Sequence, residues 1–366
     1  MMAERSINEM PILSNLLEGL LEIQPSADVP VAAIRIDSRL VQPADLFLAI
    51  EGQKTSGTRF VHDAVARGAA AILVDSISGF DAGIIPVPVL RVPNLQANTG
   101  LIASRFYGNP SNDLSITGIT GTNGKTSIAY FLAQAFSDGG TQLVGSIGTL
   151  GYGEFGKLVT NAHTTPDAVT LQHLLYQFRE RQIRDVVMEV SSHALDQGRV
   201  NNVLFNTAVF TNLSRDHLDY HGDMSGYAAA KKKLFRSPEL KNAVINADDQ
   251  FGQQLIKELG SEINVISYGL ADQDISSVGH RAHIQATIKW QELNSLLLDI
   301  MSPWGNGQLR TNLSGRFNAY NLLATLAALC IREIPFHTAL ERLSSVEGVP
   351  GRMEYFGTSD SARIYV

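Results

Sequence analysis

The apolar residues of the first hundred or so positions gather in short runs that are separated by polar turns. Runs of this kind predict strands, and they cover Val31–Ile36, Asp45–Ile50 and Ala69–Asp75. Helical spacing of apolar positions over Phe60–Gly68, closed by its glycine, and over Asn94–Phe106 predicts two helices. Glycine and proline within Tyr107–Pro110 then indicate a domain boundary. We therefore predict a small N-terminal α/β domain over residues 1–108.

Beyond this boundary the pattern becomes strand, loop and helix, repeated. The predicted strands are Leu114–Thr120, Asp185–Val190, Thr207–Thr211, Ala243–Asn246 and Asn264–Tyr268. The segment Ser127–Ser137 has the pattern of a helix. Continuous apolar strands that alternate with helices are typical of a parallel sheet covered on both faces. We therefore predict a central α/β domain with a parallel sheet over residues 109–346.

Composition narrows the class of protein. The 366 residues exceed one ordinary domain, and 44% apolar with 18% charged residues is typical of a globular protein. A net charge of -7 argues against a general nucleic-acid binder, because phosphate backbones require a surplus of Lys and Arg. The single cysteine, Cys330, lies in the apolar run Leu322–Ile331, so we expect a core thiol and not a disulfide or a nucleophile. That run, at about ten residues, is too short to span a membrane, and no signal peptide is visible, so we expect a cytoplasmic protein without membrane insertion.

A glycine-rich loop follows the predicted strand Leu114–Thr120 and opens the predicted helix. Backbone N–H groups of such a loop and the positive end of the helix bind phosphate, the lysine reaches the β- and γ-phosphates, and the following threonine holds Mg²⁺. We expect nucleotide contacts from Gly121, Thr122, Asn123, Gly124, Lys125, Thr126 and Ser127. The general phosphate-loop pattern requires a glycine where Ile119 stands, which argues against an ordinary kinase or GTPase.

Three blocks of sequence resemble the Mur ligase family. Thr120–Thr126 resembles the ATP loop that this family shares with folylpolyglutamate synthase. Met188–Arg199 and Thr211–Gly222 resemble the branch that adds the third amino acid to UDP-N-acetylmuramoyl-L-alanyl-D-glutamate. The resemblance spans nearly the whole chain and implies a monomeric, ATP-dependent phosphate-loop ligase of peptidoglycan precursor synthesis. It implies that ATP phosphorylates the D-glutamate γ-carboxylate, and that the amine of meso-diaminopimelate or L-lysine attacks the acyl phosphate.

The resemblance also implies the catalytic and metal-binding residues, which are Lys125, Thr126, Glu189, His217 and Lys231. In this interpretation Glu189 shares one Mg²⁺ with Thr126 and the nucleotide, His217 supports a second Mg²⁺, and Lys231 is carbamylated by CO₂. Two other interpretations stay open. Glu189 could be a strand-end carboxylate that faces water, and Tyr227–Lys233 could be the solvated basic face of a helix.

Contacts with the UDP-muramoyl dipeptide follow from the resemblance residue by residue. The matching positions are Ile36, Ser38, Gln53, Lys54, Thr55, His163, Thr164, Thr165, Ser191, Gln197 and Arg199. Arg199 is well suited to clamp a carboxylate with paired hydrogen bonds. The chain departs from the family at His163, where asparagine is common, and in the loop that begins at Gln53. Asn318 matches a helix near the adenine, with a capping or surface role as an equal alternative.

The resemblance implies a further, Rossmann-like C-terminal domain that completes the ATP site and holds the incoming amine. Residues 347–366 would form the linker and, in Arg363–Val366, the first strand of that domain, the rest of which is absent from the sequence. We therefore expect the chain to retain its binding chemistry and to turn over poorly alone, and its diamino acid stays undetermined. Two alternatives remain open. One is a non-catalytic protein that binds a nucleotide or UDP precursor, and the other is a phosphate-loop kinase, which would leave the first domain and Lys231 unexplained.

Overall fold

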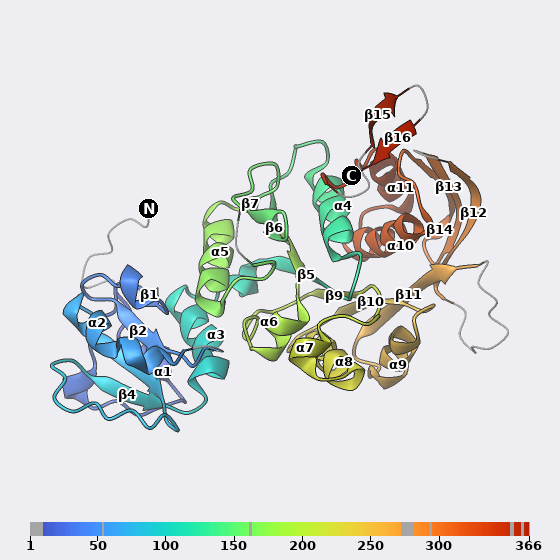
Figure 1. The fold of residues 1–366 in the computed structure, drawn as a ribbon. Coiled ribbons are helices and arrows are strands. Elements are labelled where there is room, and N and C mark those ends of the chain that lie inside the picture. The colour runs from blue at the N-terminus through green and yellow to red at the C-terminus, as the bar shows by residue number, and fades with distance from the viewer. Residues whose placement is uncertain are drawn as a thin grey trace. The chain divides into compact units, whose positions relative to one another are not determined.

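The computed structural model describes residues 10–52, 55–160, 163–271, 282–292, 295–351, 355–359 and 362–365. The chain forms two compact units. The first unit comprises Met1–Asn112, Pro166–Gln177 and Gln197–Val203, and the second comprises Asp113–Thr165, Phe178–Asp196 and Leu204–Val366. Each unit is an α/β assembly built on its own sheet (Figure 1).

The first unit contains a four-stranded parallel sheet in the order β1-β2-β3-β4. Its strands are β1 (Ile34–Arg35), β2 (Leu46–Ala49), β3 (Ala71–Asp75) and β4 (Val89–Val92). Its helices are α1 (Leu13–Leu17), α2 (Val61–Ala66) and α3 (Leu95–Phe106), with the 3₁₀ helices η2 (Pro25–Ala27), η3 (Ser38–Leu40) and η4 (Gly57–Phe60). The three predicted strands and both predicted helices are confirmed, although β1 is much shorter than expected. The sequence pattern does not predict β4.

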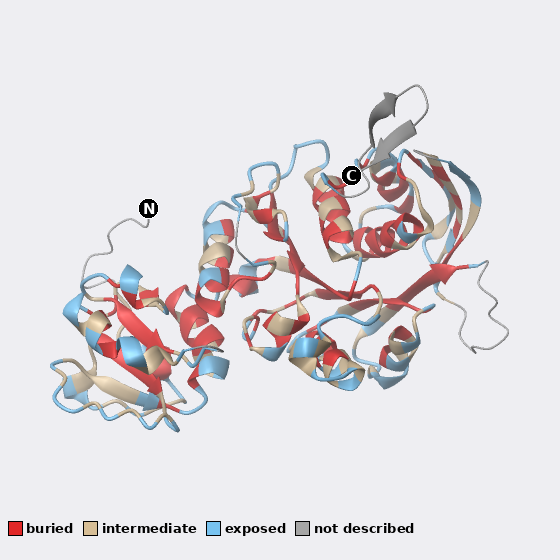
Figure 2. Cartoon of the chain, in the orientation of Figure 1, coloured by how far each residue is buried: buried red, intermediate tan, exposed pale blue. Residues whose placement is uncertain are grey.

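Apolar side chains cover both faces of this sheet. One cluster packs α1 and α3 against the strands through Leu17, Ile102 and Leu48, and a second packs α2 against them through Val61 and Phe47. Leu48 and Phe47 are neighbours in β2 and belong to different clusters, because successive side chains of a strand point to opposite faces. Burial of both faces explains why the central strands β2 and β3 are continuous apolar runs (Figure 2).

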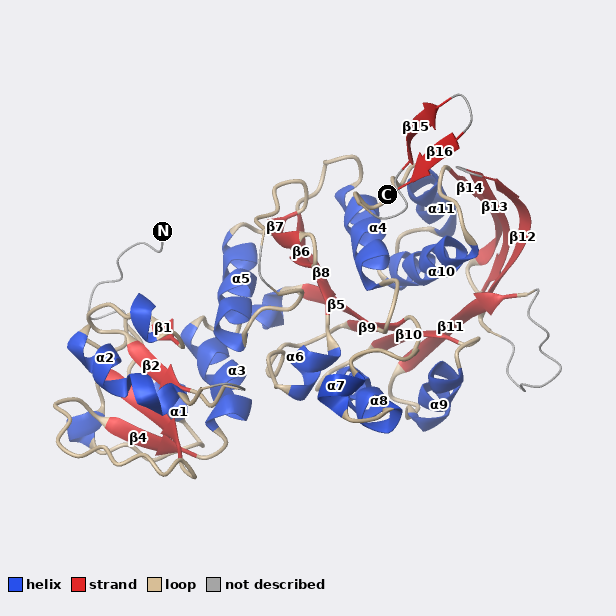
Figure 3. Cartoon of the chain, in the orientation of Figure 1, coloured by secondary structure: helices blue, strands red, loops and turns tan. Residues whose placement is uncertain are grey.

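The second unit contains a ten-stranded sheet in the order β14-β13-β12-β11-β10-β9-β5-β8-β6-β7 (Figure 3). Its strands are β5 (Ser115–Thr120), β6 (Val144–Gly148), β7 (Gly151–Glu154), β8 (Asp185–Glu189), β9 (Thr207–Phe210), β10 (Asn242–Asn246), β11 (Asn264–Leu270), β12 (Ile284–Glu292), β13 (Ser295–Ser302) and β14 (Gly305–Thr311). From β12 to β6 neighbouring strands are parallel, whereas β7, β13 and β14 join by antiparallel pairing. The predicted parallel sheet is confirmed at β5, β8, β9, β10 and β11, and antiparallel strands extend it at both edges.

Helices cover both faces of this sheet, with α4, α10 and α11 on one face and α6 to α9 on the other (Figure 1). Their bounds are α4 (Lys125–Ser137), α6 (Ser192–Asp196), α7 (Leu218–His221), α8 (Met224–Lys232), α9 (Gln250–Glu258), α10 (Arg316–Ile331) and α11 (Phe336–Ser344). The 3₁₀ helices η5 (Pro110–Asp113) and η6 (Lys233–Arg236) and the helix α5 (Ala168–Glu180), whose residues are divided between the two units, complete the set of helices in the described residues.

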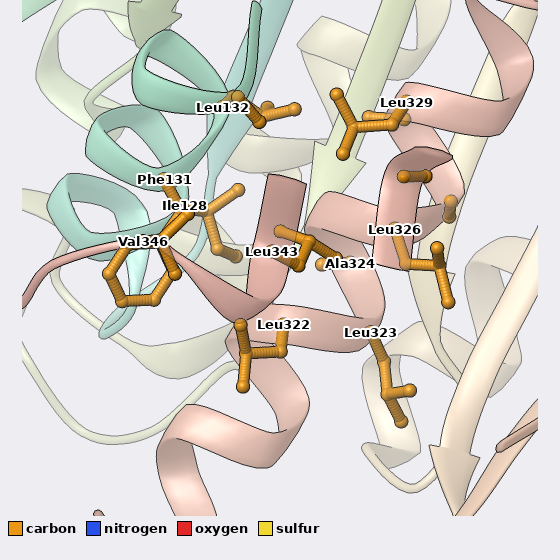
Figure 4. Packing of buried hydrophobic residues seen from close by; sticks show 14 of the residues in the cluster. Ile128, Phe131, Leu132, Leu322, Leu323, Ala324, Leu326, Leu329, Leu343 and Val346 are labelled. Carbon is orange, nitrogen blue, oxygen red and sulfur yellow. The ribbon is translucent and has the colours of Figure 1, made fainter. Parts of the chain in front are cut away.

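The largest apolar cluster lies between α4, α10, α11 and the sheet. Ile128 and Phe131 of α4 meet Leu326 of α10 and Leu343 of α11, and each of these side chains is at most 1% exposed (Figure 4). Full burial of such a side chain is worth about 1.5–3 kcal/mol relative to leaving it in water. Cys330 belongs to the same cluster, and its burial raises the pKa of the thiol to about 12. The expected core thiol is therefore confirmed.

Near the end of the chain, β15 (Tyr355–Ser359) and β16 (Ala362–Tyr365) form an antiparallel hairpin. The strand predicted from Arg363 onward is confirmed up to Tyr365, and Val366 lies outside the described residues. Within the described ranges, none of the helices is long and apolar enough to cross a lipid bilayer.

Candidate active site

The strands β8, β5 and β9 are neighbours in the sheet of the second unit and end at the same edge. Glu189 is the last residue of β8, the loop Gly121–Gly124 follows β5, and Thr211 follows β9. Strands that occur later in the sequence flank β5 on both sides, so the order of the sheet changes direction here. Ligands of parallel α/β sheets bind outside the carboxyl ends of strands at such a point.

The loop Gly121–Gly124 requires its two glycines because other groups approach it closely. Gly121 has φ +148°, and a Cβ there would lie 1.8 Å from Oγ1 of Thr211. Gly124 has φ +88°, and a Cβ there would lie 2.7 Å from Oδ1 of Asn321. A side chain at either position would displace the loop from the strands and helix that shape it.

The side chain and backbone of Asn212 hold the same loop from the direction of β9. Oδ1 of Asn212 accepts a hydrogen bond from the Asn123 N–H at 3.0 Å, and its backbone oxygen accepts one from the Thr122 N–H at 2.8 Å. Helix α4 begins at Lys125, directly after the loop. The first N–H groups of a helix have no partner within it, and together with the helix dipole they favour an anion at this end.

Two lysine side chains meet at one backbone oxygen of the loop. Nζ of Lys231 donates to the Gly121 oxygen at 2.8 Å, and Nζ of Lys125 donates to the same oxygen at 3.0 Å. Lys231 is only 1% exposed, and its Nζ lies 4.3 Å from the centre of the Tyr227 ring. Burial and the nearby charge of Lys125 lower the pKa of Lys231 to about 6. The interpretation of this lysine as part of a solvated basic face is therefore wrong, and its amine is mostly uncharged at neutral pH.

The carboxylate of Glu189 is buried and fully engaged. Oε2 accepts from Oγ1 of Thr126 at 2.8 Å and from Oγ1 of Thr149 at 3.3 Å, and Oε1 accepts from the Thr149 N–H at 2.7 Å. Glu189 is 1% exposed, so the interpretation of a carboxylate that faces water is wrong. A Cβ at Gly148 would lie 2.3 Å from Oε1, so the glycine leaves the space that the carboxylate fills.

The oxygen atoms of Thr126 and Glu189 are the ligands that suit Mg²⁺, so this pair fits the metal expected from the sequence. In the part of the chain that the structure describes, no three His, Cys, Asp or Glu side chains converge as a metal-binding group. The metal-binding residues predicted from the sequence include only two of these residue types, Glu189 and His217. The others are the hydroxyl of Thr126 and the side chain of Lys231.

Of the predicted residues His163 to Thr165, Thr165 reaches the same strand end. Oγ1 of the buried Thr165 donates to the backbone oxygen of Glu189 at 2.9 Å and accepts from the Ser191 N–H at 3.1 Å. Thr164 is half-buried and His163 is exposed. The hydroxyl of Thr165 thus binds backbone atoms of Glu189 and Ser191 at the end of β8, whereas His163 is exposed to solvent.

His217 precedes helix α7 and has φ 52°, a left-handed conformation. Its N–H donates to Oδ1 of Asp216 at 2.9 Å. Its ring centre lies 4.8 Å from that of His193 and 6.1 Å from that of Tyr227. Since Lys231 lies against the same Tyr227 ring, His217 is placed one aromatic ring away from the buried lysine.

A cavity of about 630 Å³ adjoins the loop in the second unit. Its walls carry six asparagines, Asn123, Asn212, Asn246, Asn312, Asn318 and Asn321, and we call it the asparagine pocket. Phe131, Tyr268, Phe317 and Tyr320 provide aromatic walls, and Ser127 also lines it. Asparagine amides offer both donors and acceptors, and aromatic rings stack on flat groups, so the pocket suits a nucleobase.

The predicted contacts Asn318 and Ser127 both line the asparagine pocket. Asn318 also has a structural part, because its Nδ2 donates to the Ser314 oxygen at 2.8 Å and its Oδ1 accepts from Asn321 at 3.2 Å. The alternative of an exposed surface role for Asn318 is wrong, since the residue is 8% exposed.

The remaining predicted residues that the structure describes belong to the first unit, and they are Ile36, Ser38, Thr55, Gln197 and Arg199. Ser38 is buried at the start of η3, and Ile36 is 38% exposed. Nε of Arg199 donates to Oε1 of Gln197 at 2.8 Å, so these two side chains form one group. Gln53 and Lys54 lie outside the described residues.

Sequence reasoning missed several residues of the site, and three of them share one kind of position. Thr149 follows β6, Asn212 lies two positions beyond the end of β9, and Asn246 is the last residue of β10. Each polar side chain stands at the carboxyl end of a parallel strand, and that position is the signal that identifies them.

Two family models match the chain. A model described as the Mur ligase middle domain matches residues 119–329, and one described as Mur ligase family, catalytic domain, matches residues 30–107. The first covers the loop, Glu189 and Lys231, and the second covers most of the first unit.

Individual relatives agree with these models. The chain is 47% identical over 331 residues to UDP-N-acetylmuramoyl-L-alanyl-D-glutamate--2,6-diaminopimelate ligase of Chromobacterium violaceum, covering 90% of this chain and 65% of the relative. It is 44% identical over 344 residues to the protein of the same name from Coxiella burnetii, covering 93% of this chain and 69% of the relative. A solved structure of a ligase of that name matches with a TM-score of 0.81 at 28% identity, covering 96% of this chain and 70% of that chain. The chain thus spans roughly two thirds of the length of the curated relatives.

Proposed function

The chain belongs to the Mur ligase family, and on that premise we propose that it is an ATP-dependent amide ligase of peptidoglycan precursor synthesis. The substrate that we propose is UDP-N-acetylmuramoyl-L-alanyl-D-glutamate. The γ-carboxylate of the D-glutamate would attack the γ-phosphorus of ATP, which releases ADP and gives an acyl phosphate. The amine of a diamino acid would then attack the acyl carbon, lose a proton and release phosphate, which leaves an amide bond. The names of the relatives favour 2,6-diaminopimelate over lysine as that diamino acid. Because ATP and the UDP-linked dipeptide are both nucleotides, we propose that the protein is cytoplasmic. We also propose that it acts as a monomer.

The observation that carries this proposal is the buried carboxylate of Glu189, hydrogen-bonded at 2.8 Å to Thr126 at the start of α4. A carboxylate is costly to bury unless it is paired or coordinates a cation. Thr126 and Glu189 would hold Mg²⁺, which when bound neutralises the charge that gathers on the phosphates. Lys125 and the N–H groups of the loop would hold the phosphates themselves, with the base in the asparagine pocket.

The environment of Lys231 supports carbamylation as part of the proposal. An amine attacks CO₂ only when it is unprotonated, and burial lowers the pKa of Lys231 to about 6. The nitrogen lone pair forms a bond to the carbon of CO₂, one proton leaves the nitrogen, and an anionic carbamate results. That carbamate would replace a buried amine by two oxygen ligands beside the loop, and His217 would support a second Mg²⁺ from beyond the Tyr227 ring.

The remaining predicted residues would bind the UDP-muramoyl dipeptide. Thr165 and Ser191 are hydrogen-bonded at the end of the strand that carries Glu189, and His163 and Thr164 directly precede Thr165 in the chain. In the first unit, Gln197 and Arg199 would bind a carboxylate of the substrate, and Ile36, Ser38 and residues 53–55 would bind the uridine. We propose residues 1–108 and 109–346 as the domains that supply the UDP and ATP sites, with residues 347–366 as a linker and the first strand of a C-terminal domain.

Calorimetric titration with a non-hydrolysable ATP analogue tests the nucleotide site. We expect saturable binding that requires Mg²⁺, and a fall in affinity of about tenfold or more in Glu189→Gln. The matched control Glu341→Gln removes an exposed carboxylate of α11 and should change nothing. Equal binding in Mg²⁺ and in EDTA would contradict the assignment of Glu189.

Titration with UDP-N-acetylmuramoyl-L-alanyl-D-glutamate tests the substrate. Arg199→Ala should weaken binding, whereas Arg67→Ala, an exposed arginine of the same unit, should not. With ¹³C-labelled bicarbonate, the wild type should show a carbamate carbon signal that Lys231→Ala lacks. A folded chain that binds neither ligand would refute the proposed function.

A further inference from the structure

A series of hydrogen bonds joins the α10 wall of the asparagine pocket to the phosphate-binding loop. The hydroxyl of Tyr320 donates to Oδ2 of Asp248 at 2.8 Å, and the Asp248 N–H donates to Oδ1 of Asn246 at 3.0 Å. Nδ2 of Asn246 donates to the backbone oxygen of Thr211 at 2.8 Å, and Oγ1 of Thr211 donates to the backbone oxygen of Asn123 at 2.6 Å. We call this series the Tyr320–Asn123 relay.

The members of the relay are held in place by their surroundings. Thr211 and Asn246 are 3% and 7% exposed, so their hydrogen bonds are shielded from water. Oδ2 of Asp248 also accepts from the Leu270 N–H at 2.9 Å, which fixes the carboxylate toward Tyr320. Burial and the carboxylate of Asp248 raise the pKa of Tyr320 to about 12, so its hydroxyl remains a donor at neutral pH.

Four members of the relay, Tyr320, Asn246, Thr211 and Asn123, line the asparagine pocket, whereas Asp248 is not among its described lining residues. An effect of Asp248 on the pocket would therefore pass through Tyr320, which its carboxylate binds. The relay fixes the spacing between the pocket wall on α10 and the loop before α4. A ligand that fills both regions gains affinity when they are already held in the bound arrangement, and a ligand that fills only one gains nothing.

We propose that Asp248 and Tyr320 are positioning residues, which hold the base-binding wall and the phosphate-binding loop at the separation that one nucleotide spans. This inference rests on the proposed binding of ATP and deepens it. The pair should therefore raise the affinity for whole nucleotides and leave the affinities for a nucleoside and for an inorganic phosphate unchanged.

The test compares a whole ligand with its two parts. Dissociation constants of ADP, adenosine and pyrophosphate are measured on the full chain with Mg²⁺, the weak ligands by displacement of labelled ADP. Tyr320→Phe keeps the aromatic wall and removes the donor. We expect the affinity for ADP to fall about tenfold, while the affinities for adenosine and pyrophosphate change less than about threefold. Asp248→Ala should give the same pattern, and the double variant should be no weaker than either single variant, because both break one link.

Tyr268→Phe is the matched control. Tyr268 lines the same pocket, but its hydroxyl donates to the Phe210 oxygen at 3.1 Å and lies outside the relay. This variant should leave the ratio of the ADP and adenosine affinities unchanged. Equal losses for ADP and adenosine in Tyr320→Phe, or no loss for ADP, would overturn the inference and leave the proposed function intact. A folded wild-type chain that does not bind ADP would contradict the proposed function, and the inference with it.

Discussion

Replacement of Lys231 by methionine should make the protein more stable at neutral pH. Methionine has a similar length and no charge, so it fills the buried space beside Tyr227 without the cost of keeping an amine out of water. The Gly121 oxygen, which loses Lys231 as a donor, keeps Lys125 as a second donor at 3.0 Å. The substitution therefore leaves no buried acceptor without a partner at this point.

The magnitude follows from the pKa of Lys231, which is about 6 in the folded protein against its ordinary 10.5. The folded state binds the proton more weakly than the unfolded chain does. The loss of folding stability caused by the buried lysine is therefore fully present below pH 6, decreases as the pH rises, and is absent above pH 10.5. A pH of 7 lies about 3.5 units below the pKa of this lysine in the unfolded chain. At about 1.36 kcal/mol per unit, the loss of folding stability at pH 7 is about 5 kcal/mol. Relaxation of the surroundings and the lost hydrogen bond reduce this, and we expect a net gain of about 2 kcal/mol.

The measurement is urea denaturation of wild type and Lys231→Met from pH 6 to pH 9, in buffer freed of CO₂ and without Mg²⁺. The stability difference should be largest at pH 6 and shrink steadily toward pH 9. Lys257→Met, an exposed lysine of α9, is the control and should show no such trend. A variant that is less stable than the wild type at pH 7, or a difference that does not change with pH, would refute the reasoning.

Three further experiments test other parts of the structure. Gly148→Ala places a Cβ 2.3 Å from Oε1 of Glu189, so the affinity for a Mg²⁺-bound nucleotide, measured by calorimetry, should fall about tenfold. Gly260→Ala is the control and should bind the nucleotide normally, because a Cβ there meets nothing within 4 Å. Leu326→Ala should cost about 2–5 kcal/mol in urea denaturation, and Met301→Ala, at a position 52% exposed, under about 0.5 kcal/mol. Comparable losses in these two variants would contradict the placement of the core. Cys330 should resist thiol reagents in the native protein at pH 8, because its pKa is raised to about 12, and it should react once urea unfolds the protein. Rapid labelling of the native protein would show that this part of the core is open.

Much of the fold can be predicted from the sequence because both faces of the central strands are buried. β8 and β9 are nearly continuous apolar runs, and their pattern is independent of which strands stand beside them. β13 is different, since its residues alternate between buried and partly exposed positions. One face packs in the core through Leu296, Leu298 and Ile300. Its pairing with β12 and β14 depends on a register that a single run of sequence does not specify.

The residues of the candidate site also differ in how well the sequence predicts them. The loop Gly121–Gly124 and the residues Lys125 and Thr126 are contiguous, so their chemistry can be read from one short block. Thr149 binds the carboxylate of Glu189 only because β6 and β8 are neighbours in the sheet. Strand order is a property of the whole fold, and no local pattern reports it. The burial of Lys231 likewise depends on Tyr227 and the loop packing around it, although Lys232 and Lys233 follow it directly in the sequence.

The walls of the asparagine pocket carry no charged side chain among the described residues, whereas the charged amine of Lys125 binds the backbone of the loop beside it. Dissolved ions weaken attraction between charges over a distance of about 8 Å at physiological ionic strength, and they leave neutral hydrogen bonds unchanged. The two ends of the site should therefore differ in their sensitivity to salt. Recognition of the base should be the same in dilute and in concentrated electrolyte, and a change in ionic strength should alter nucleotide affinity through the phosphates alone.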